Sequence, residues 1–190
     1  MSDMTSSEEQ LRRRLLGEPP GQVLLGWLGP LAAAIVGGIL RFWDLGRPHQ
    51  LVFDETYYVK QAWSILQWGV EMRNGGPYGD KPDEAFTRGT LDVFNTTDGD
   101  LVVHGPVGKW VIAAGQALFG GADSSVGWRF SVCVLGTLSI LMIGRIARRL
   151  LGSSVLGTIA AILLAFEGHH FVHSRTGLLD LILMFFALGA

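Results

Sequence analysis

Two adjacent carboxylates, Asp54 and Glu55, are the side chains of this sequence best suited to acid–base chemistry. A carboxylate that loses solvation beside an apolar region becomes a better proton acceptor, so either residue could act as a general base. The pair also suits the first turn of a helix, where Asp54 would cap the backbone and Glu55 would favour the positive end. Both interpretations, general base and helix start, are open from these residues alone.

Cationic side chains lie on both sides of this segment in the sequence. Arg41 and Arg129 stand beside Trp43 and Trp128 at the ends of apolar runs. In such places arginine can anchor a chain at a membrane interface. Two arginines on the same face could instead hold a lipid phosphate, because the guanidinium fork suits that group.

Two further segments carry polar residues next to apolar runs. A turn rich in Gly and Pro places His104 and Lys109 ahead of a short apolar stretch. It could lie against a phosphate or an acceptor chain, or it could be a simple turn in which the lysine stem follows apolar surface. Asp180 begins another apolar run, where an ionisable group predicts either a functional site with Arg175 as its partner or a structural ion pair.

A short cluster of histidines precedes that last segment. His169 and His173 are four residues apart, with Glu167 nearby, and two metal ligands can have this spacing. The sequence therefore leaves a divalent metal ion open as a cofactor, but it assigns no metal ligand and predicts no other cofactor.

Apolar helices must position these residues. The 190 residues are 48% hydrophobic and 17% charged, and the charged share lies below the roughly 25% of soluble domains. Uncharged runs cover residues 23–40, 130–144 and 150–166, and a fourth begins at Leu178. Because about 20 apolar residues span a bilayer, we predict an all-α polytopic membrane protein. The net charge of −2 gives no indication of a nucleic-acid partner.

The arginines predict the orientation. Clusters at residues 12–14 and 145–149 bracket the first two predicted spans, and positive residues favour the cytoplasmic side. The location we predict is the plasma membrane, with several spans, a cytoplasmic N-terminus and the functional polar residues outside. The predicted order is a disordered cytoplasmic tail (1–22), membrane helix 1 (23–43), an extracytoplasmic loop (44–127), membrane helices 2 (128–147) and 3 (150–168), and the start of helix 4 (177–190).

The large loop itself is expected to contain helices. Trp and Tyr at helical spacing in residues 57–68 predict a helix lying in the membrane interface. Residues 109–119 predict a second short helix, closed by Gly120-Gly121. Residues 69–100, dense in Gly, Asp, Asn and Thr, predict irregular chain.

In this order the motifs resemble those of the protein O-mannosyltransferases, the dolichyl- or polyprenyl-phosphate-mannose–protein mannosyltransferases of the GT-C superfamily, and in particular their bacterial, actinobacterial-like branch. The matching segments begin at Arg41 and continue with Phe53-Asp54-Glu55-Thr56-Tyr57-Tyr58, His104-Gly105-Pro106-Val107-Gly108-Lys109-Trp110, Trp128-Arg129-Phe130 and Ser174-Arg175-Thr176-Gly177-Leu178-Leu179-Asp180. One departure is Gly105, where the family turn usually has Pro. Family members have many more membrane helices, so the resemblance implies an N-terminal portion.

The resemblance implies a GT-C-type transmembrane helix bundle whose first loop carries the interfacial helices. It implies a hexosyltransferase that moves mannose, with inversion, from polyprenyl-phosphate-mannose to Ser or Thr hydroxyls of exported proteins. Asp54 would be the base, with Glu55 beside it, and Arg41 and Arg129 would neutralise the departing phosphate. The other implied substrate-binding residues are His104, Lys109, Arg175 and Asp180. Implied partners are the lipid donor, secreted or membrane protein acceptors, the bilayer and the protein export machinery.

Two rival functions stay open at this point. A different GT-C enzyme would pass its sugar to a glycan or a lipid. A non-enzymatic transporter or scaffold would place paired charges in broken helices at the bilayer midplane, whereas the charges of this sequence are expected at one interface.

Overall fold

The computed structural model describes residues 20–74 and 81–190, and these residues are mostly helical. In chain order the elements are α2 (Pro20–Phe42), α3 (Glu55–Trp68), β1 (Met72–Asn74), α4 (Pro82–Thr87), β2 (Phe94–Gly99), α5 (Pro106–Phe119), the 3-10 turn η1 (Gly121–Asp123), α6 (Ser125–Leu151), α7 (Ser154–Phe166), α8 (Gly168–His173) and α9 (Leu179–Gly189). Most of the predicted tail lies outside the described residues. Its last part, residues 20–22, already belongs to α2.

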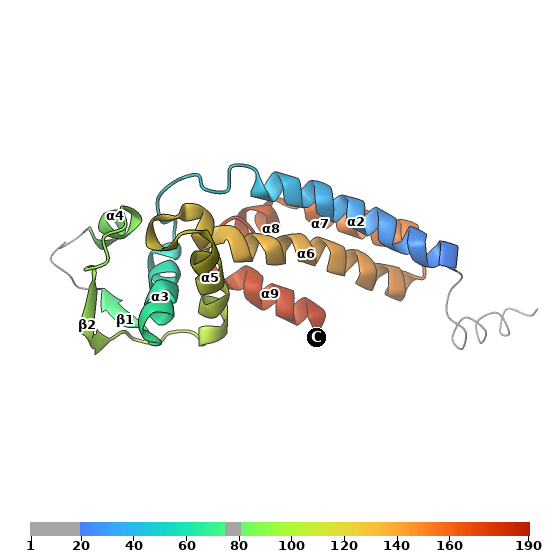
Figure 1. Ribbon diagram of the computed structural model, residues 1–190. Helices are drawn as coiled ribbons and strands as arrows, with labels where there is room; N and C mark the ends of the chain where they lie inside the picture. The colour runs from blue at the N-terminus through green and yellow to red at the C-terminus, as the bar shows by residue number, and fades with distance from the viewer. Residues whose placement is uncertain (1–19, 75–80) are drawn as a thin grey trace, which may run out of the picture.

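Helices α2, α6 and α7 form an elongated bundle, and α9 packs against α6 (Figure 1). Small residues let the helix backbones approach closely. A Cβ added to Gly144 would lie 2.7 Å from Pro30 of α2 and 3.0 Å from Ala161 of α7. The seam between these helices is apolar, with Ala33, Ile140 and Ala161 buried in it.

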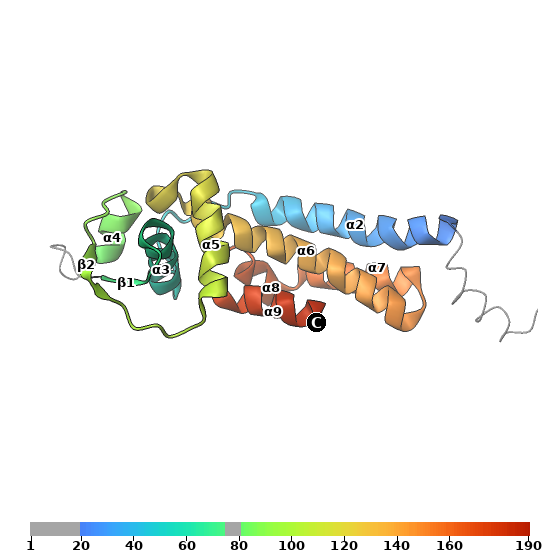
Figure 2. The same ribbon diagram turned by 60° about the horizontal axis from the view of Figure 1, so that its bottom comes forward.

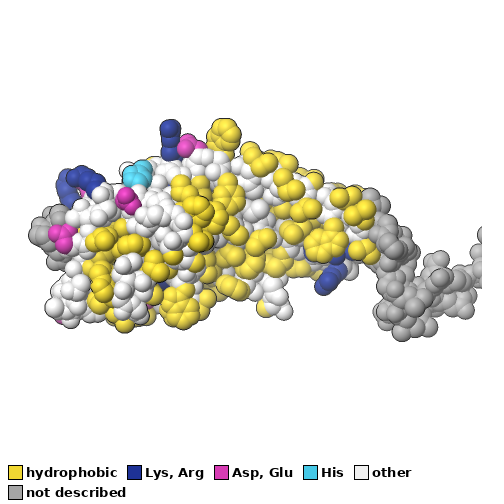
Figure 3. Space-filling view, viewed as in Figure 1, with side chains coloured by type: hydrophobic (Ala, Val, Ile, Leu, Met, Phe, Trp, Pro, Cys, Tyr) yellow, Lys and Arg dark blue, Asp and Glu magenta, His cyan; other side chains and the backbone are white. Residues whose placement is uncertain are grey.

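The length and composition of α6, 27 residues, are those of a helix that can cross a membrane, and among the described helices it alone meets this description. The apolar part of α2 (Gly26–Phe42), α7 and α9 are shorter. Hydrophobic side chains nevertheless cover much of the visible bundle surface (Figure 3). An exterior rich in apolar side chains is typical of a surface that faces a membrane or another protein segment.

A second group of elements stands at one end of the bundle. There α3 packs against α5, and α4 and the small sheet lie beyond α3 (Figures 1 and 2). Both helices end at a glycine in the left-handed conformation, Gly69 at φ 76° and Gly120 at φ 106°, as helix C-termini commonly do. The closure of α5 at Gly120 was expected. Its start is earlier than expected, because Pro106 occupies the first turn, a position that suits proline.

The prediction of irregular chain over residues 69–100 was wrong for three segments. β1 and β2 pair antiparallel, with Asn74 opposite Phe94, and α4 lies between them in the sequence. The polar composition concealed a few apolar residues that decide the structure. Phe86, Val93 and Phe94 are buried in the same core as Val59 of α3.

Candidate functional site

Asp54 directly precedes α3, but its side chain does not cap the helix. Only its backbone carbonyl takes part in the first turn, accepting hydrogen bonds from the amides of Tyr57 at 2.9 Å and Tyr58 at 3.0 Å. The charge of the carboxylate acts on the hydroxyl of Tyr58, one helical turn further on. The capping interpretation is therefore wrong for the side chain, which leaves the carboxylate available for other contacts.

Tyr58 connects Asp54 to a second carboxylate from a distant part of the chain. Asp180 lies in the first turn of α9. Burial raises the pKa of the Tyr58 hydroxyl, and the charges of Asp54 and Asp180 raise this pKa further. Tyr58 consequently stays protonated at neutral pH and offers a hydroxyl donor near two acids.

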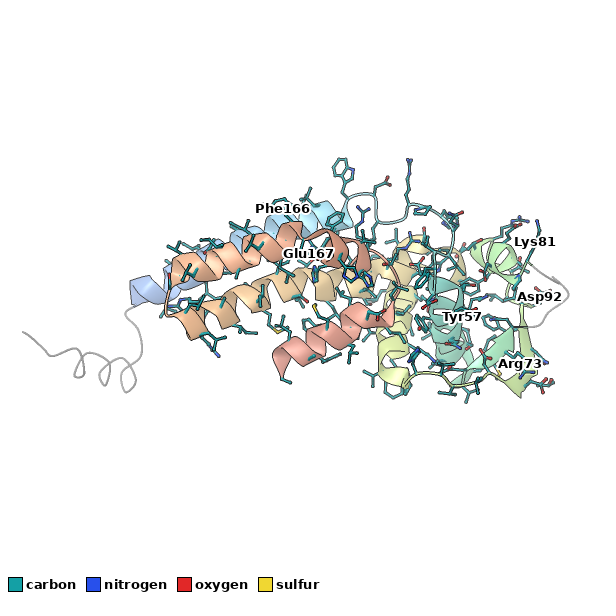
Figure 4. The ribbon with its side chains drawn as sticks, turned by 180° about the vertical axis from the view of Figure 1, so that it is seen from behind. Tyr57, Arg73, Lys81, Asp92, Phe166 and Glu167 are labelled. Atoms are coloured by element: carbon teal, nitrogen blue, oxygen red, sulfur yellow. The ribbon has the colours of Figure 1, made fainter. Side chains whose placement is uncertain are left out.

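Two adjoining cavities surround this group at the bundle end that carries α3. One, of about 240 Å³, is lined by Asp54, Tyr57, Tyr58, Gln61, Val103 and His104. The other, of about 290 Å³, shares Tyr58 and His104 and also contains Asp180. The rings of Tyr58 and His104 meet edge to face with centroids 5.6 Å apart. Figure 4 labels Tyr57 on α3 in this region. Three of the predicted site residues, Asp54, His104 and Asp180, thus come together.

Glu55 lies elsewhere, although it is the neighbour of Asp54. Its side chain is fully buried and bound to Arg129, with Nε to Oε1 and NH2 to Oε2 both at 2.8 Å. The amide of Gly177 donates to Oε1 at 2.7 Å and the amide of Val52 to Oε2 at 2.9 Å. Each carboxylate oxygen therefore has two partners, which suits a positioning role better than contact with substrate.

The two arginines expected to hold phosphate point into the protein. Arg129 gives its remaining donors to the carbonyls of Leu45, Pro48 and Gln50, at 3.0–3.3 Å. Arg41 is also fully buried. It donates to the carbonyls of Gly37, Leu164 and Ala165 and to the ring of His170. Both guanidinium groups hold elements together in this arrangement.

The remaining predicted cations also have protein partners. Lys109 is fully buried and forms an ion pair with Glu71 at 2.6 Å, which fixes the start of α5 beside β1. Arg175 donates to the carbonyls of Trp43 at 2.7 Å and Asp44 at 3.2 Å, and does not pair with Asp180. Arg175 also borders a third cavity, of about 480 Å³, together with Arg47 and Arg129.

The histidine cluster occupies α8, a short helix that the sequence did not predict. His169 and His173 face each other with ring centroids 4.1 Å apart. Glu167 caps α8 by accepting from the amides of His169 and His170. Within residues 20–74 and 81–190, no group of three or more His, Cys, Asp or Glu side chains is placed to hold a metal ion.

Sequence reasoning missed Tyr58 as a neighbour of Asp54 and His170 as the partner of Arg41. Tyr58 had a usable signal, because it follows Asp54 by four residues and so lies on the same face of a helix. His170 had none, since its partner Arg41 is 129 residues away.

Comparison with known proteins agrees with the motifs. Residues 103–190 match the family described as dolichyl-phosphate-mannose-protein mannosyltransferase. The chain is similar to polyprenol-phosphate-mannose–protein mannosyltransferases of Mycolicibacterium smegmatis, at 39% identity over 87% of the chain, and Mycobacterium tuberculosis, at 37% identity over 88%. The protein of the same name from Corynebacterium glutamicum is 37% identical over 73% of the chain and 23% of that relative. No solved structure shows significant similarity to the chain.

These findings confirm the family predicted from the motifs, and the chain is related to the protein mannosyltransferases over most of its length. It spans 28% of the length of the two mycobacterial relatives.

Proposed function

We propose that this chain carries the acid–base site of an enzyme that transfers mannose from polyprenyl-phosphate-mannose to Ser or Thr hydroxyls of exported proteins. The observation that carries the proposal is the placement of Asp54. The Asp54 residue lines a cavity, its carboxylate is not used as a helix cap, and its charge acts on the hydroxyl of Tyr58. The names of the mycobacterial relatives support the donor and the protein acceptor.

In the proposed reaction the acceptor hydroxyl oxygen forms a bond to the anomeric carbon of mannose. The bond from that carbon to the phosphate oxygen breaks, and its electron pair leaves with the lipid phosphate. Asp54 takes the hydroxyl proton, and attack from the face opposite the phosphate inverts the anomeric centre. Because the lipid phosphate is a fair leaving group, the protein mainly supplies position and electrostatic stabilisation. A hydrogen bond donated by the Tyr58 hydroxyl would hold the Asp54 carboxylate in one orientation.

Among the predicted substrate ligands, His104 and Asp180 retain access to a substrate beside Asp54. His104 is exposed and lies on the walls of both cavities, and Asp180 lies on the wall of the second. Arg175 borders the separate arginine-lined cavity. The buried contacts of Arg41, Arg129 and Lys109 favour positioning roles for them.

The proposal includes the membrane arrangement expected from the sequence. Helices α2, α6, α7 and α9 would be membrane segments of a multi-pass plasma-membrane protein, with α3–α5 on the extracytoplasmic side. Two features support this arrangement. Arg148 and Arg149 lie in the last turn of α6, at the end of the bundle opposite α3 and α5 (Figure 1). The exterior of the bundle between these ends is rich in apolar side chains (Figure 3).

A transfer assay tests the proposal. Membranes containing the full-length protein are incubated with labelled polyprenyl-phosphate-mannose and a Ser/Thr-rich peptide, beside a matched peptide in which every Ser and Thr is Ala. We expect label on the first peptide alone. Label that appears only on glycans or lipids, or no transfer at all, would contradict the proposed function.

A further inference from the structure

His170 of α8 takes no part in the proposed reaction, yet the two nitrogens of its imidazole have different and well-defined surroundings. The side chain is buried, at 5% exposure, and its Nδ1 lies 3.0 Å from NH2 of Arg41. A guanidinium can only donate, so Nδ1 must accept this hydrogen bond. The ring is neutral, because burial and, secondarily, the charge of Arg41 lower the pKa of His170 to about 4. The single ring proton therefore lies on Nε2.

This Nε2–H group is a donor without an acceptor. Its atom is buried and finds no hydrogen-bond partner among the residues that the structure describes. Buried polar groups in native proteins are nearly always paired. The Nδ1 edge of the ring faces Arg41. The His170 side chain also forms part of the wall of a cavity of about 280 Å³. A group that enters this cavity with an oxygen acceptor would satisfy Nε2–H.

The walls of the cavity define the chemistry of that group. Its other polar walls include the carboxylates of Glu167 and Asp180, which accept hydrogen bonds. Two carboxylates disfavour an anion, and a protonated Nε2 cannot coordinate a metal cation. Leu164 and Met184 provide apolar surface on the same cavity. Donors, acceptors and apolar surface together suit a neutral ring that carries several hydroxyl groups.

We propose that this cavity binds a neutral sugar ring, with one sugar oxygen accepting the hydrogen bond from His170 Nε2 and the carboxylate of Asp180 accepting from a sugar hydroxyl. Asp180 also lines the cavity that contains Tyr58 and His104, so the sugar site adjoins the proposed reaction site. The identification of the sugar as the mannosyl group of the lipid donor rests on the proposed function.

The test uses the full-length protein in nanodiscs and two lipids, polyprenyl-phosphate-mannose and polyprenyl phosphate without sugar. In His170→Asn the side-chain oxygen can take the place of Nδ1 as the acceptor from Arg41, while the Nε2–H donor is lost. We expect this variant to bind the mannosyl lipid about three- to tenfold more weakly, the usual worth of one hydrogen bond, and to bind polyprenyl phosphate as the wild type does. His49→Asn makes the same chemical change outside the cavity and should leave both affinities unchanged.

A second variant tests the cavity independently, so that the proposal stays testable if His170→Asn does not fold. Met184→Phe narrows the cavity from the α9 side without touching the His170–Arg41 contact, and it should also weaken binding of the mannosyl lipid selectively. A parallel titration with a mannosylated Ser/Thr peptide shows whether the sugar belongs to the donor or to an acceptor, and selective weakening of either supports the site. The proposed sugar site would be overturned if both variants bound both lipids equally more weakly, or if neither variant bound the mannosyl lipid or the mannosylated peptide more weakly. The transfer assay with the wild-type protein reports separately on the proposed function.

Discussion

The carboxylate of Glu55 and the guanidinium of Arg129 form a two-point ion pair, with both nitrogen–oxygen distances at 2.8 Å and both side chains at most 1% exposed. The pair joins the start of α3 to α6. Through the amide of Gly177, it also holds the segment that leads into α9. Asp54 is adjacent to Glu55 in the chain, and Asp180 follows Gly177 by three residues. The ion pair therefore ties together the two chain segments that carry the acids near Tyr58.

Breaking this pair should destabilise the protein. In Glu55→Gln the buried Arg129 loses its counter-charge, and we expect the free energy of unfolding to fall by about 3–5 kcal/mol, as for other buried pairs. Denaturant unfolding of the purified full-length protein measures this. Glu84→Gln, which removes the partner of the exposed Arg88, is the matched control and should cost no more than about 1 kcal/mol.

The same measurement separates two roles for Arg129. A positioning role predicts that Arg129→Lys unfolds more easily, because Lys cannot reproduce the two-point contact. The phosphate-binding role expected from the sequence predicts instead an unchanged unfolding curve with a raised KM for the lipid donor. An unchanged unfolding curve with a raised KM would support a substrate-binding role for Arg129 and contradict the positioning role.

Lys109 and Glu71 should behave as one unit. Lys109→Met leaves Glu71 buried without its partner, so we expect a loss of about 3–5 kcal/mol in the free energy of unfolding. The double variant Lys109→Met, Glu71→Met removes both charges and should be more stable than Lys109→Met alone. A double variant less stable than either single variant would contradict the pairing.

The pKa of His170 predicts a pH dependence of stability. This pKa is lowered to about 4 in the folded protein from an ordinary value of 6.5. Between these values the unfolded chain binds a proton that the folded chain does not bind, so stability is full above pH 6.5 and declines as the pH falls toward 4. Thermal unfolding of the wild type and of His170→Asn between pH 4 and pH 7.5 should show a smaller decline in the variant. Identical declines would contradict the neutral, buried imidazole.

The membrane orientation can be tested by labelling. The background is the full-length protein in which Cys133 and any other native cysteines are replaced by Ala. Single cysteines are then placed at Asp98 of β2, which is expected outside, and at Arg149 in the last turn of α6, which is expected inside. An impermeant maleimide added to intact cells should label the first and not the second. Labelling at Arg149 alone, or at both positions, would overturn the orientation and the extracytoplasmic site with it.

The helices were the predictable part of this fold. Apolar periodicity and aromatic spacing indicated α3 and α5, and uninterrupted apolar runs indicated the bundle helices. Residues 69–100 misled the prediction because three buried apolar side chains, Phe86, Val93 and Phe94, order a segment whose composition is typical of loops. Local composition does not show where such residues will find a core.

The site was predictable in its residue types but not in its pairings. Asp54 was predicted as the base from its motif and position, yet nothing local distinguishes it from Glu55. The difference arises because Glu55 meets Arg129, 74 residues away. Lys109 and Glu71 are likewise far apart in sequence. Lys109 was expected to bind substrate, but in the folded chain it is buried in an ion pair with Glu71. Such long-range contacts are properties of the folded chain.

The most direct test of the account is the turnover of Asp54→Asn in the full-length protein. The substitution keeps the size of the side chain, and a helix-capping role would tolerate it because Asn caps as well as Asp. The cap is absent here in any case. We therefore predict a fall in kcat of about 10²-fold or more for mannose transfer to a Ser/Thr peptide, the usual worth of a positioned general base. Unfolding and binding of polyprenyl-phosphate-mannose should be unchanged. The control Asp98→Asn, which alters an exposed acid of β2 whose partner is the nearby Asn95, should retain activity. A stable Asp54→Asn enzyme with near-normal kcat would contradict the account.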